Sequence, residues 1–414
     1  VPSRLHPGKF YALPQSPQQY KQLLMVAGVD RYFQIARCFR DEDLRADRQP
    51  EFTQIDLEMS FVDQEDVMAV NEGFLKRVFK TVLGVDIETP ILRMPYKEAM
   101  ERYGSDKPDL RFGLELRDLT DLVKDCGFKV FTDAVSAGGS VRAICVPGGA
   151  KAFPRKQIDQ LTEFVKTCGA KGLAWLRLSE EGTSSSFAKF MTEDEMAAIQ
   201  ARCEAKMGDL VLIVADPSGK AVFTALGALR CEVARRMGLI PEGVFKLVWI
   251  TEFPMFEYSE EEGRYVAVHH PFTAPLDEDF ELLETAPERC RAKAYDIVLN
   301  GVEIGGGSIR INTPEVQRRM FRALQLREED AQERFGHLLT AFKYGAPPHG
   351  GLAYGLDRLV MLLAGAESIR DVIAFPKVQN ASELMTGSPD VVEPKQLTEL
   401  HIAVTEDALA KKCK

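Results

Sequence analysis

Alternating hydrophobic and polar positions predict a chain of mixed strands and helices. The apolar run at residues 32–36 and the alternation of Phe52, Ile55 and Leu57 predict two strands, and the charged stretch between them predicts a hairpin with a polar, mobile tip. Further short apolar runs predict strands at residues 141–146, 210–214, 247–253, 295–299 and 308–311. Helical spacing predicts helices at residues 155–168 and 356–363. We therefore expect an α+β fold.

The distribution of these elements divides the chain into three blocks. Residues 1–112 and 245–414 contain nearly all the charged and glycine-rich segments that are suited to chemistry. Residues 113–244 contain short β-rich runs and amphipathic stretches with few candidate catalytic groups. We predict one catalytic domain, made from residues 1–112 and 245–414, that is interrupted by an inserted α+β domain at residues 113–244.

Composition narrows the class of protein. Of the 414 residues, 45% are hydrophobic and 28% charged, as in globular proteins, and no apolar run of about eighteen residues predicts a transmembrane helix. The eight cysteines include no CxxC pair, which favours reduced thiols in a cytoplasmic protein over zinc sites or a disulfide framework. A formal net charge of −10 argues against unspecific coating of nucleic acid, but it allows contacts through local basic patches.

The first segment with candidate chemistry is the charged stretch at residues 37–58. It places Arg40 at the expected end of a strand, directly before Asp41 and Glu42. An arginine in that position suits two-pronged recognition of a phosphate or carboxylate. The alternative is a solvated surface hairpin, because charged runs usually lie on the protein surface.

The second segment contains Asp296, Glu303 and the glycines at residues 305–307. The dipeptide at residues 300–301, Asn-Gly, predicts a tight turn between antiparallel strands, which would bring the two carboxylates to one face. Paired carboxylates suit Mg²⁺ that carries substrate phosphates, and glycines would let a flat ligand approach the backbone. The alternative for the glycines is a flexible turn.

The third segment, residues 349–359, predicts a strand that passes into a helix. Small residues at Gly351, Ala353 and Gly355 would leave one strand face bare, with room for a ring, and Arg358 near the helix start would meet a phosphate tail. Neither a Walker loop nor a dinucleotide-binding GxGxxG fingerprint occurs in the sequence.

Together these segments resemble motif 2 and motif 3 of the class II aminoacyl-tRNA synthetases, and more closely the aspartyl-tRNA synthetases of the bacterial and mitochondrial type. The resemblance implies an antiparallel sheet flanked by helices, and residues 113–244 resemble the insertion domain that bacterial aspartyl enzymes share with an amidotransferase subunit. The segments that carry the resemblance are residues 15–21, 39–42, 49–54, 269–273 and 355–358.

The resemblance also implies an ATP site with Mg²⁺ and no other cofactor. It assigns catalysis to Arg40, Glu303 and Arg358, and the metal to Asp296 and Glu303. It implies in-line attack of the amino-acid carboxylate on the α-phosphorus, helped by positioning and charge neutralisation and without a covalent nucleophile. The ATP-binding residues that it implies are Arg40, Asp41, Glu42, Gln49, Phe52, Glu303, Gly355, Leu356, Asp357 and Arg358.

For the amino acid, the resemblance implies L-aspartate. An arginine fork fits a carboxylate, whereas an amide would leave buried donors unpaired at a cost of roughly 1–3 kcal/mol. Lys21 could instead extend from an apolar helix face to solvent, and His269 could be an ordinary strand residue, as could His270 and the turn residue His349. The aspartate-binding residues implied by the resemblance are Gln18, Lys21, Arg40, Asp56, His269 and Arg310.

The implied partners are ATP, L-aspartate and the acceptor end of tRNA(Asp), with tRNA(Asn) as a second candidate, in a homodimer with no membrane contact. We expect the family's motif 1 and anticodon-binding barrel to be missing from this chain, which would impair activity and tRNA discrimination. Two alternatives remain: an amino-acid-activating or amide-forming ligase of the asparagine-synthetase type, and a catalytically inactive binding module.

Overall fold

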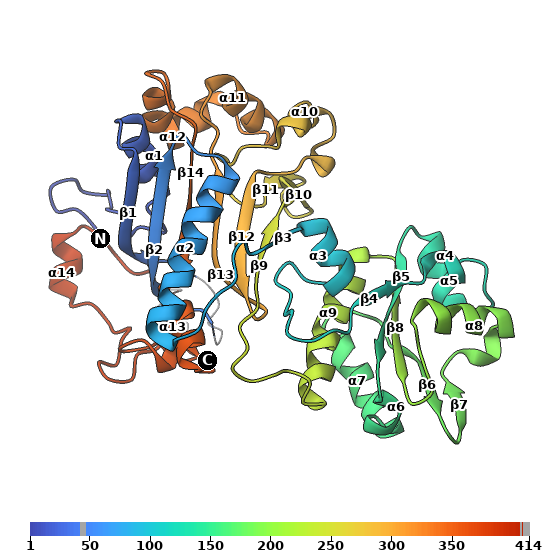
Figure 1. Ribbon diagram of the computed structural model, residues 1–414. Helices are drawn as coiled ribbons and strands as arrows, with labels where there is room; N and C mark the ends of the chain where they lie inside the picture. Colours follow the sequence, from blue (N-terminus) through green and yellow to red (C-terminus); the bar gives the residue numbers. More distant parts are fainter. Residues whose placement is uncertain (42–46, 406–407, 409–414) are drawn as a thin grey trace. The chain divides into compact units, whose positions relative to one another are not determined.

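The structure is a computed structural model that describes residues 1–41, 47–405 and 408, and the chain divides into two compact units (Figure 1). The first unit contains Val1–Ile87, Ile304–Arg322 and Leu326–Lys414. The second unit contains Glu88–Glu303 and Ala323–Gln325. No helix among the described residues is long and apolar enough to cross a membrane, and the seven described cysteines are all free thiols.

The first unit contains an antiparallel sheet in the order β1-β2-β14-β13. The predicted charged hairpin is confirmed, because β1 pairs with β2 from Arg31↔Met59 to Phe39↔Glu51. β13 begins in the second unit and continues into the first. The four strands are β1 (Arg31–Phe39), β2 (Glu51–Ser60), β13 (Val302–Ile309) and β14 (His349–Gly355).

Helices contact both faces of this sheet. α2 covers one face, where Phe74 lies 5.1 Å from Tyr354 between ring centroids. α1 covers the opposite face, where its Lys21 reaches Asp56 of β2. The predicted helix after β14 is confirmed as α13. The helices are α1 (Gln18–Val26), α2 (Gln64–Leu83), α11 (Pro314–Ala323), α12 (Glu328–Phe342), α13 (Leu356–Ala364) and α14 (Pro394–Glu399), with a 3₁₀ turn η4 (Ile369–Asp371).

α2 shows how the local sequence sets a helix. Asp63 accepts a hydrogen bond from the Asp66 backbone N–H, and the Asp66 side chain accepts one from the Asp63 N–H. This capping box satisfies two donors at the helix start. At the other end Gly84 adopts a φ of 72°, the left-handed conformation that commonly closes a helix.

The second unit contains three strands in the order β12-β9-β3. β12 (Ala294–Leu299) and β9 (Leu247–Thr251) are antiparallel, whereas β3 (Leu92–Pro95) is parallel to β9. The predicted strand at residues 247–253 ends early, because Glu252 turns to a φ of 55°. A separate hairpin pairs β10 (Phe256–Ser259) with β11 (Arg264–Ala267).

A five-stranded antiparallel sheet lies within the stretch predicted as the inserted domain, in the order β4-β5-β8-β6-β7. Both faces are buried: Ile144 and Leu212 belong to one apolar cluster, and Ala143 and Ile213 belong to another. Burial on both faces explains the unbroken apolar run of β8. The strands are β4 (Leu116–Asp118), β5 (Ser140–Val146), β6 (Ala174–Ser179), β7 (Gly182–Ser185) and β8 (Leu210–Asp216), which confirms the runs at 141–146 and 210–214.

The helices of the second unit include α7, which confirms the amphipathic helix predicted at residues 155–168. The domain boundaries themselves stay a prediction. The helices are α3 (Tyr96–Tyr103), α4 (Thr120–Val123), α5 (Lys129–Ser136), α6 (Gly149–Ala152), α7 (Arg155–Thr167), α8 (Glu193–Arg202), α9 (Gly219–Arg236) and α10 (Leu282–Thr285), with 3₁₀ turns η1 (Ala188–Phe190), η2 (Asp277–Asp279) and η3 (Pro287–Arg289).

Candidate active site

One face of the first unit's sheet combines small residues with acidic side chains. Directly opposite residues of paired strands lie on the same face of a sheet. We call the face that contains Asp56 and Glu58 the site face. On this face, strand β2 places Gln54, Asp56 and Glu58 opposite Gly355, Ala353 and Gly351 of β14, respectively. Ala353 and Gly351 in turn lie opposite Gly306 and Ser308 of β13.

The glycines of β13 and β14 allow the strands and an acidic side chain to approach closely. A Cβ atom at Gly351 would overlap the carboxylate of Glu58 and the carbonyl oxygen of Leu57. A Cβ atom at Gly307 would overlap the carbonyl oxygen of Gly351. The flexible-turn alternative for residues 305–307 is wrong, because they lie inside β13, which begins six residues before the predicted start at Ser308.

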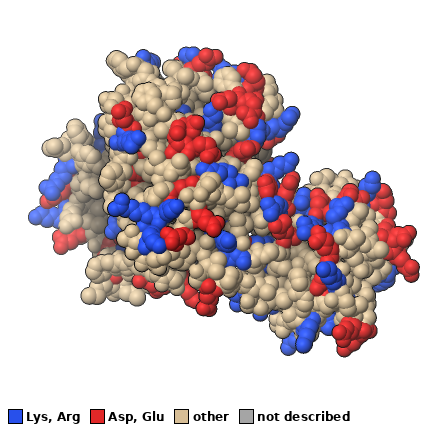
Figure 2. Space-filling view, in the orientation of Figure 1, with Lys and Arg blue, Asp and Glu red and all other residues tan. Residues whose placement is uncertain are grey.

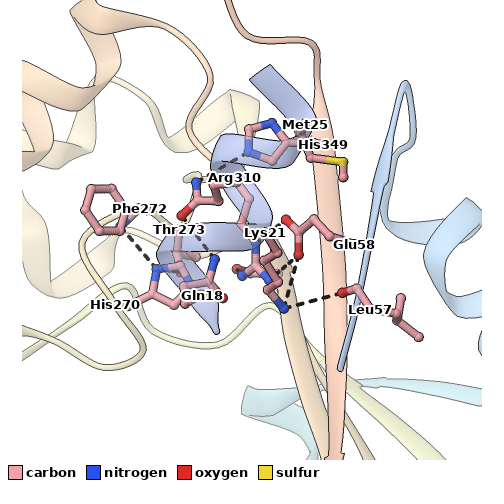
Figure 3. A network of polar contacts seen from close by, with 12 residues as sticks. Gln18, Lys21, Met25, Leu57, Glu58, His270, Phe272, Thr273, Arg310 and His349 are labelled. Carbon is pink, nitrogen blue, oxygen red and sulfur yellow. Dashed lines mark hydrogen bonds and ion pairs between the residues drawn. The ribbon is translucent and has the colours of Figure 1, made fainter. Parts of the chain in front are cut away.

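Two cations and two carboxylates form a buried cluster on the site face, and Figure 3 shows Lys21, Arg310 and Glu58 of this cluster. Lys21 Nζ lies 2.7 Å from Asp56 Oδ1 and 3.2 Å from Glu58 Oε2. Arg310 donates from Nε and Nη2 to the two oxygens of Glu58 at 2.9 and 3.0 Å, and from Nη1 to Ser308. Lys21 is 2% exposed, so the alternative that it extends to solvent is wrong. We call Lys21, Asp56, Glu58 and Arg310 the charge cluster.

The two carboxylates of the charge cluster respond differently to it. Although burial opposes ionisation, Arg310 and Lys21 hold the pKa of Glu58 at about 2. Burial raises the pKa of Asp56, since Lys21 and Arg310 do not offset the lost hydration and the negative charge of Glu58. Asp56 Oδ2 is buried and accepts no hydrogen bond from the described atoms. Glu58 is therefore a fixed anion, and Asp56 is the carboxylate able to accept a further cation.

A polar chain leads from Arg310, whose backbone N–H donates to the His349 carbonyl at 2.9 Å, to Gln22 and Gln18 of α1. His349 is fully buried, with Nδ1 2.7 Å from the Pro347 carbonyl oxygen and Nε2 3.4 Å from Gln22 Nε2. Gln18 donates to the Gln22 oxygen at 3.1 Å. Burial lowers the pKa of His349 despite the nearby Glu58, so this histidine is a neutral part of the network. Its location at the start of β14 differs from the turn position considered in the sequence.

Arg40 lies directly after β1, as predicted. Its backbone N–H donates to the Pro50 carbonyl at 2.9 Å, and its guanidinium lies 5.0 Å from the centroid of the Phe52 ring. Phe52 occupies the same strand face as Gln54 because side chains alternate along β2. Asp41 is exposed at the start of the hairpin loop. Glu42 lies outside the described residues.

The motif 3 residues Asp357 and Arg358 contact the part of the hairpin that follows its loop. Asp357, in the first turn of α13, accepts a hydrogen bond from the Thr53 backbone N–H at 2.8 Å. Arg358 donates to the Asp47 carboxylate at 3.3 Å. Gly355 and Leu356 form the junction of β14 and α13. Gln49 is buried, and both ends of its side-chain amide bond the main chain of Lys377.

The predicted metal carboxylates lie in the second unit. Asn300 and Gly301 have φ angles of 52° and 84°, so the predicted tight turn between β12 and β13 is confirmed. Burial, then repulsion from Glu303 and Asp106, raises the pKa of Asp296 well above its usual value. Among the described residues, no group of three or more His, Cys, Asp or Glu could hold a metal ion.

The two predicted histidines of residues 269–273 also lie in the second unit. His269 meets Phe253 edge-on with ring centroids 5.1 Å apart. His270 Nδ1 accepts a hydrogen bond from the Phe272 backbone N–H at 3.2 Å, which orders the local turn (Figure 3). Neither histidine lies in a strand, so the strand-residue alternative is wrong, and the contact of His270 is structural.

A family model described as tRNA synthetases class II (D, K and N) matches residues 1–379. The chain belongs to this family. The aspartate–tRNA ligase of Ruminiclostridium cellulolyticum is 65% identical over 408 residues, which are 98% of this chain and 68% of that protein. The aspartate–tRNA(Asp/Asn) ligase of Lachnoclostridium phytofermentans is 63% identical over 409 residues, which are 99% and 68% of the two chains. A solved aspartyl tRNA synthetase from Entamoeba histolytica is similar only at a TM-score of 0.44 and 18% identity, over 88% of this chain and 51% of that one.

The structure adds Glu58 to the residues of this class II synthetase that sequence patterns had singled out. The sequence placed Glu58 in the charged segment but gave it no role, and the structure makes it the partner of both Lys21 and Arg310. The sequence did contain one indication that Glu58 belongs to the site. Asp56 and Glu58 are separated by one residue in a strand, so both carboxylates had to lie on the same face.

Proposed function

We propose that this synthetase activates L-aspartate with ATP and transfers the aspartyl group to the 3′ end of tRNA(Asp), with tRNA(Asn) as a second candidate acceptor. Its relatives named aspartate–tRNA ligase support this substrate. The observation that carries the proposal is the pair of buried cations, Lys21 and Arg310, on a sheet face that combines small residues with the carboxylates of Asp56 and Glu58. Such a pair suits a side-chain carboxylate, and an amide would leave charged donors mismatched.

The amino acid is proposed to bind at the charge cluster. Its side-chain carboxylate lies beside Arg310 and Lys21, and Glu58 holds the guanidinium in one orientation. The α-ammonium faces Asp56, whose buried Oδ2 would gain a charged donor in place of lost hydration. Gln18, the first residue of α1, is proposed to lie near the α-ammonium.

The nucleotide is proposed to bind further along the site face, toward the end of the hairpin. Adenine would stack on the Phe52 ring, whose neighbour Arg40 would contact the α-phosphate and the amino-acid carboxylate. Gly355 has no side chain and lies opposite Gln54 on the site face, so it leaves this part of the face uncovered. Arg358 would hold the γ-phosphate, and Asp41 is proposed to lie near the nucleotide.

The chemistry proceeds by positioning of substrates. An oxygen of the aspartate α-carboxylate attacks the α-phosphorus of ATP, the bond to the β-phosphate oxygen breaks, and pyrophosphate leaves. A terminal hydroxyl of tRNA then attacks the activated carbonyl carbon and releases its proton, the bond from that carbon to the phosphate oxygen breaks, and AMP leaves with the bonding electrons. Arg40 would compensate the charge on the phosphorus oxygens, and no side chain forms a covalent bond.

Asp296 and Glu303 fit the Mg²⁺ that this chemistry implies. Burial, and then repulsion from Glu303, raises the pKa of Asp296, and a divalent cation held by the two carboxylates would relieve that repulsion. A pair of carboxylates is a typical protein contribution to Mg²⁺, which retains water and phosphate oxygens. Mg²⁺, when bound, would neutralise phosphate charge.

The cellular setting remains part of the proposal. We propose a cytoplasmic homodimer that acts on tRNA without a membrane contact. The inserted domain at residues 113–244, with its own buried core, is proposed to lie outside the chemical steps.

Transfer of labelled aspartate tests this proposal against the amide-forming alternative. The purified protein is incubated with ATP, Mg²⁺, labelled L-aspartate and either tRNA(Asp), tRNA(Asn) or ammonia. We expect label on tRNA(Asp) and no asparagine. Formation of asparagine without charged tRNA would contradict the proposal, and charging of tRNA(Asn) would establish the second acceptor.

A further inference from the structure

Residues 104–113, which we call the linking segment, follow α3 in the second unit and are held by α9 of the same unit. The first contact is between glycines. An added Cβ atom at Gly227 of α9 would lie 2.4 Å from the Gly104 carbonyl oxygen, and one at Gly104 would lie 2.9 Å from the Gly227 nitrogen. The start of the linking segment therefore meets α9 backbone to backbone, an approach that only glycines allow.

Arg230 of α9 holds the far end of the linking segment, and it is 1% exposed. Its Nε donates to the Gly113 carbonyl at 3.1 Å, and its Nη2 donates to the carbonyls of Asp109 and Phe112 at 2.7 and 2.9 Å. The guanidinium carbon also lies 4.1 Å from the centroid of the Phe112 ring and 4.9 Å from that of the Tyr103 ring. One side chain thus fixes three main-chain carbonyls of the segment.

Burying the charge of Arg230 has a cost, and burial lowers the pKa of this arginine. The Asp109 carboxylate is engaged by Arg111, whose Nη2 lies 2.7 Å away and whose backbone N–H donates at 3.0 Å. An apolar side chain could pack against the same two rings without losing the hydration of a charge. The arginine is therefore better explained by the order that its fork of donors imposes on the linking segment than by stability.

The linking segment borders the hairpin that contains the candidate metal carboxylates. Asp109 is buried, and an added Cβ atom at Gly301 would lie 3.1 Å from the Asp109 Cβ atom. Gly301 belongs to the turn between β12 and β13, the two strands on which those carboxylates lie. The segment is also close enough to act on their charge, because Asp106 raises and Lys107 lowers the pKa of Asp296. The segment that α9 holds is therefore a support of this hairpin.

We propose that Arg230 is a positioning residue for the cation site of Asp296 and Glu303, acting through the linking segment and the β12–β13 turn without contact with the cation. The inserted domain thereby sets the Mg²⁺ affinity of the synthetase and takes no part in the chemical steps. This inference rests on the proposed function. Loss of Arg230 lets the turn shift and weakens cation binding. Aspartate binding is unaffected, because the charge cluster is held by its own ion pairs in the first unit.

Two substitutions test this role. Arg230→Met removes the guanidinium, and Arg230→Lys keeps the charge but loses the fork that reaches three carbonyls. The dissociation constant of Mn²⁺ from the nucleotide-free protein is measured by electron paramagnetic resonance of the unbound ion, together with the melting temperature. The Mg²⁺ concentration for half-maximal pyrophosphate exchange and KM for aspartate are measured in parallel. We expect the Mn²⁺ constant and the Mg²⁺ concentration to rise about tenfold in both variants, as when metal ligands lose their outer support, with KM for aspartate unchanged.

Arg235→Met is the matched control, because Arg235 lies on the same helix in an exposed pair with Glu232, and its loss should leave every value unchanged. The double variant Arg230→Met/Asp296→Asn should bind Mn²⁺ no more weakly than Asp296→Asn, since both changes act on one site. Should the Arg230 variants fail to fold, Phe112→Leu removes one ring from the guanidinium and keeps its three hydrogen bonds. That variant should raise the Mn²⁺ constant about threefold.

Two results would overturn the inference while leaving the proposed function in place. One is a lowered melting temperature in the Arg230 variants with an unchanged Mn²⁺ constant, which would show a purely structural role. The other is an equal weakening of Mn²⁺ binding in Arg235→Met, which would show an effect of net charge. If Asp296→Asn binds Mn²⁺ as tightly as the unaltered protein does, the proposed function fails at its cation site, and the inference fails with it.

Discussion

Opposite charges balance in the charge cluster, with Lys21 and Arg310 facing Asp56 and Glu58. A buried ion pair adds little net stability compared with apolar packing, because both charges lose their hydration. Breaking the pair is costly, since one charge stays buried without compensation. The cluster is therefore better explained by the need to orient cations for a charged substrate than by stability.

Arg310→Lys tests the role of the guanidinium. A lysine keeps the charge but loses the two-pronged contact with Glu58 and the fixed plane. We expect KM for aspartate in pyrophosphate exchange to rise roughly 30- to 100-fold, corresponding to about 2–3 kcal/mol, with KM for ATP nearly unchanged. Arg327→Lys, in a surface pair with Asp330, is the control. An unchanged KM for aspartate would remove Arg310 from the amino-acid site.

Glu58→Gln tests the electrostatics. The pKa of Glu58 is lowered from 4.5 to about 2 in the folded protein, so its ion pairs stabilise the fold above the unfolded-state pKa and are lost as pH falls through the folded-state pKa. We expect the variant to lose about 3 kcal/mol of unfolding free energy at neutral pH. Denaturant unfolding should show this difference shrinking between pH 4.5 and 2. A difference independent of pH would contradict the ionised pair.

The family resemblance identified Lys21, Asp56 and Arg310 as candidate site residues. It gave no role to Glu58, which pairs with both Lys21 and Arg310. Glu58 and Arg310 are 252 residues apart, and no local pattern reports a contact at that separation. The same limit applies to Lys377 and Gln49, which are 328 residues apart. Contacts of this kind depend on strand order, which the sequence does not display.

At the level of strands, glycines are required where β14 crosses the acidic residues of β2. Gly351→Ala would place a Cβ against the Glu58 carboxylate and the Leu57 carbonyl oxygen, and the second of these is backbone that cannot move aside. We expect a loss of about 1–3 kcal/mol in unfolding free energy and a raised KM for aspartate. Gly73→Ala is the control, because nothing lies within 4 Å of its added Cβ in α2. It should be neutral or stabilising. An equal loss of unfolding free energy in Gly351→Ala and Gly73→Ala would contradict the role of close packing.

The β12–β13 hairpin leads to a prediction about pH and Mg²⁺. Because the pKa of Asp296 is raised, protons compete with a cation there at higher pH than at an ordinary aspartate. The Mg²⁺ concentration for half-maximal exchange should therefore rise as pH falls. Asp296→Asn should need more Mg²⁺ at every pH and show a weaker pH dependence, whereas Asp277→Asn, an exposed residue paired with Lys293, should match the unaltered protein. The same pH dependence in Asp296→Asn would exclude Asp296 from cation binding.

Local elements were predictable because each has a local cause. The Asn-Gly turn, the charged hairpin, α7 and α13 follow from turn chemistry and periodicity. The start of β13 was missed because its glycines weaken the strand pattern, and they are tolerated only because β14 lies so close. The parallel pairing of β3 with β9 joins segments on either side of the predicted insertion, so no sequence window contained it.

The whole molecule carries a formal net charge of −10. The face in Figure 2 mixes basic and acidic side chains and has no single basic field, in keeping with a net charge of −10. Any tRNA contact would then depend on local basic residues. We therefore make our central proposal about the small substrates: buried cations on the site face select aspartate for activation.

Aspartate-dependent ATP–pyrophosphate exchange tests that claim most directly, with asparagine and glutamate as competitors at equal concentration. We predict exchange with aspartate and at least 100-fold lower kcat/KM with asparagine, because an amide cannot match the charged donors of Arg310 and Lys21. Exchange supported by asparagine and not by aspartate would contradict the account.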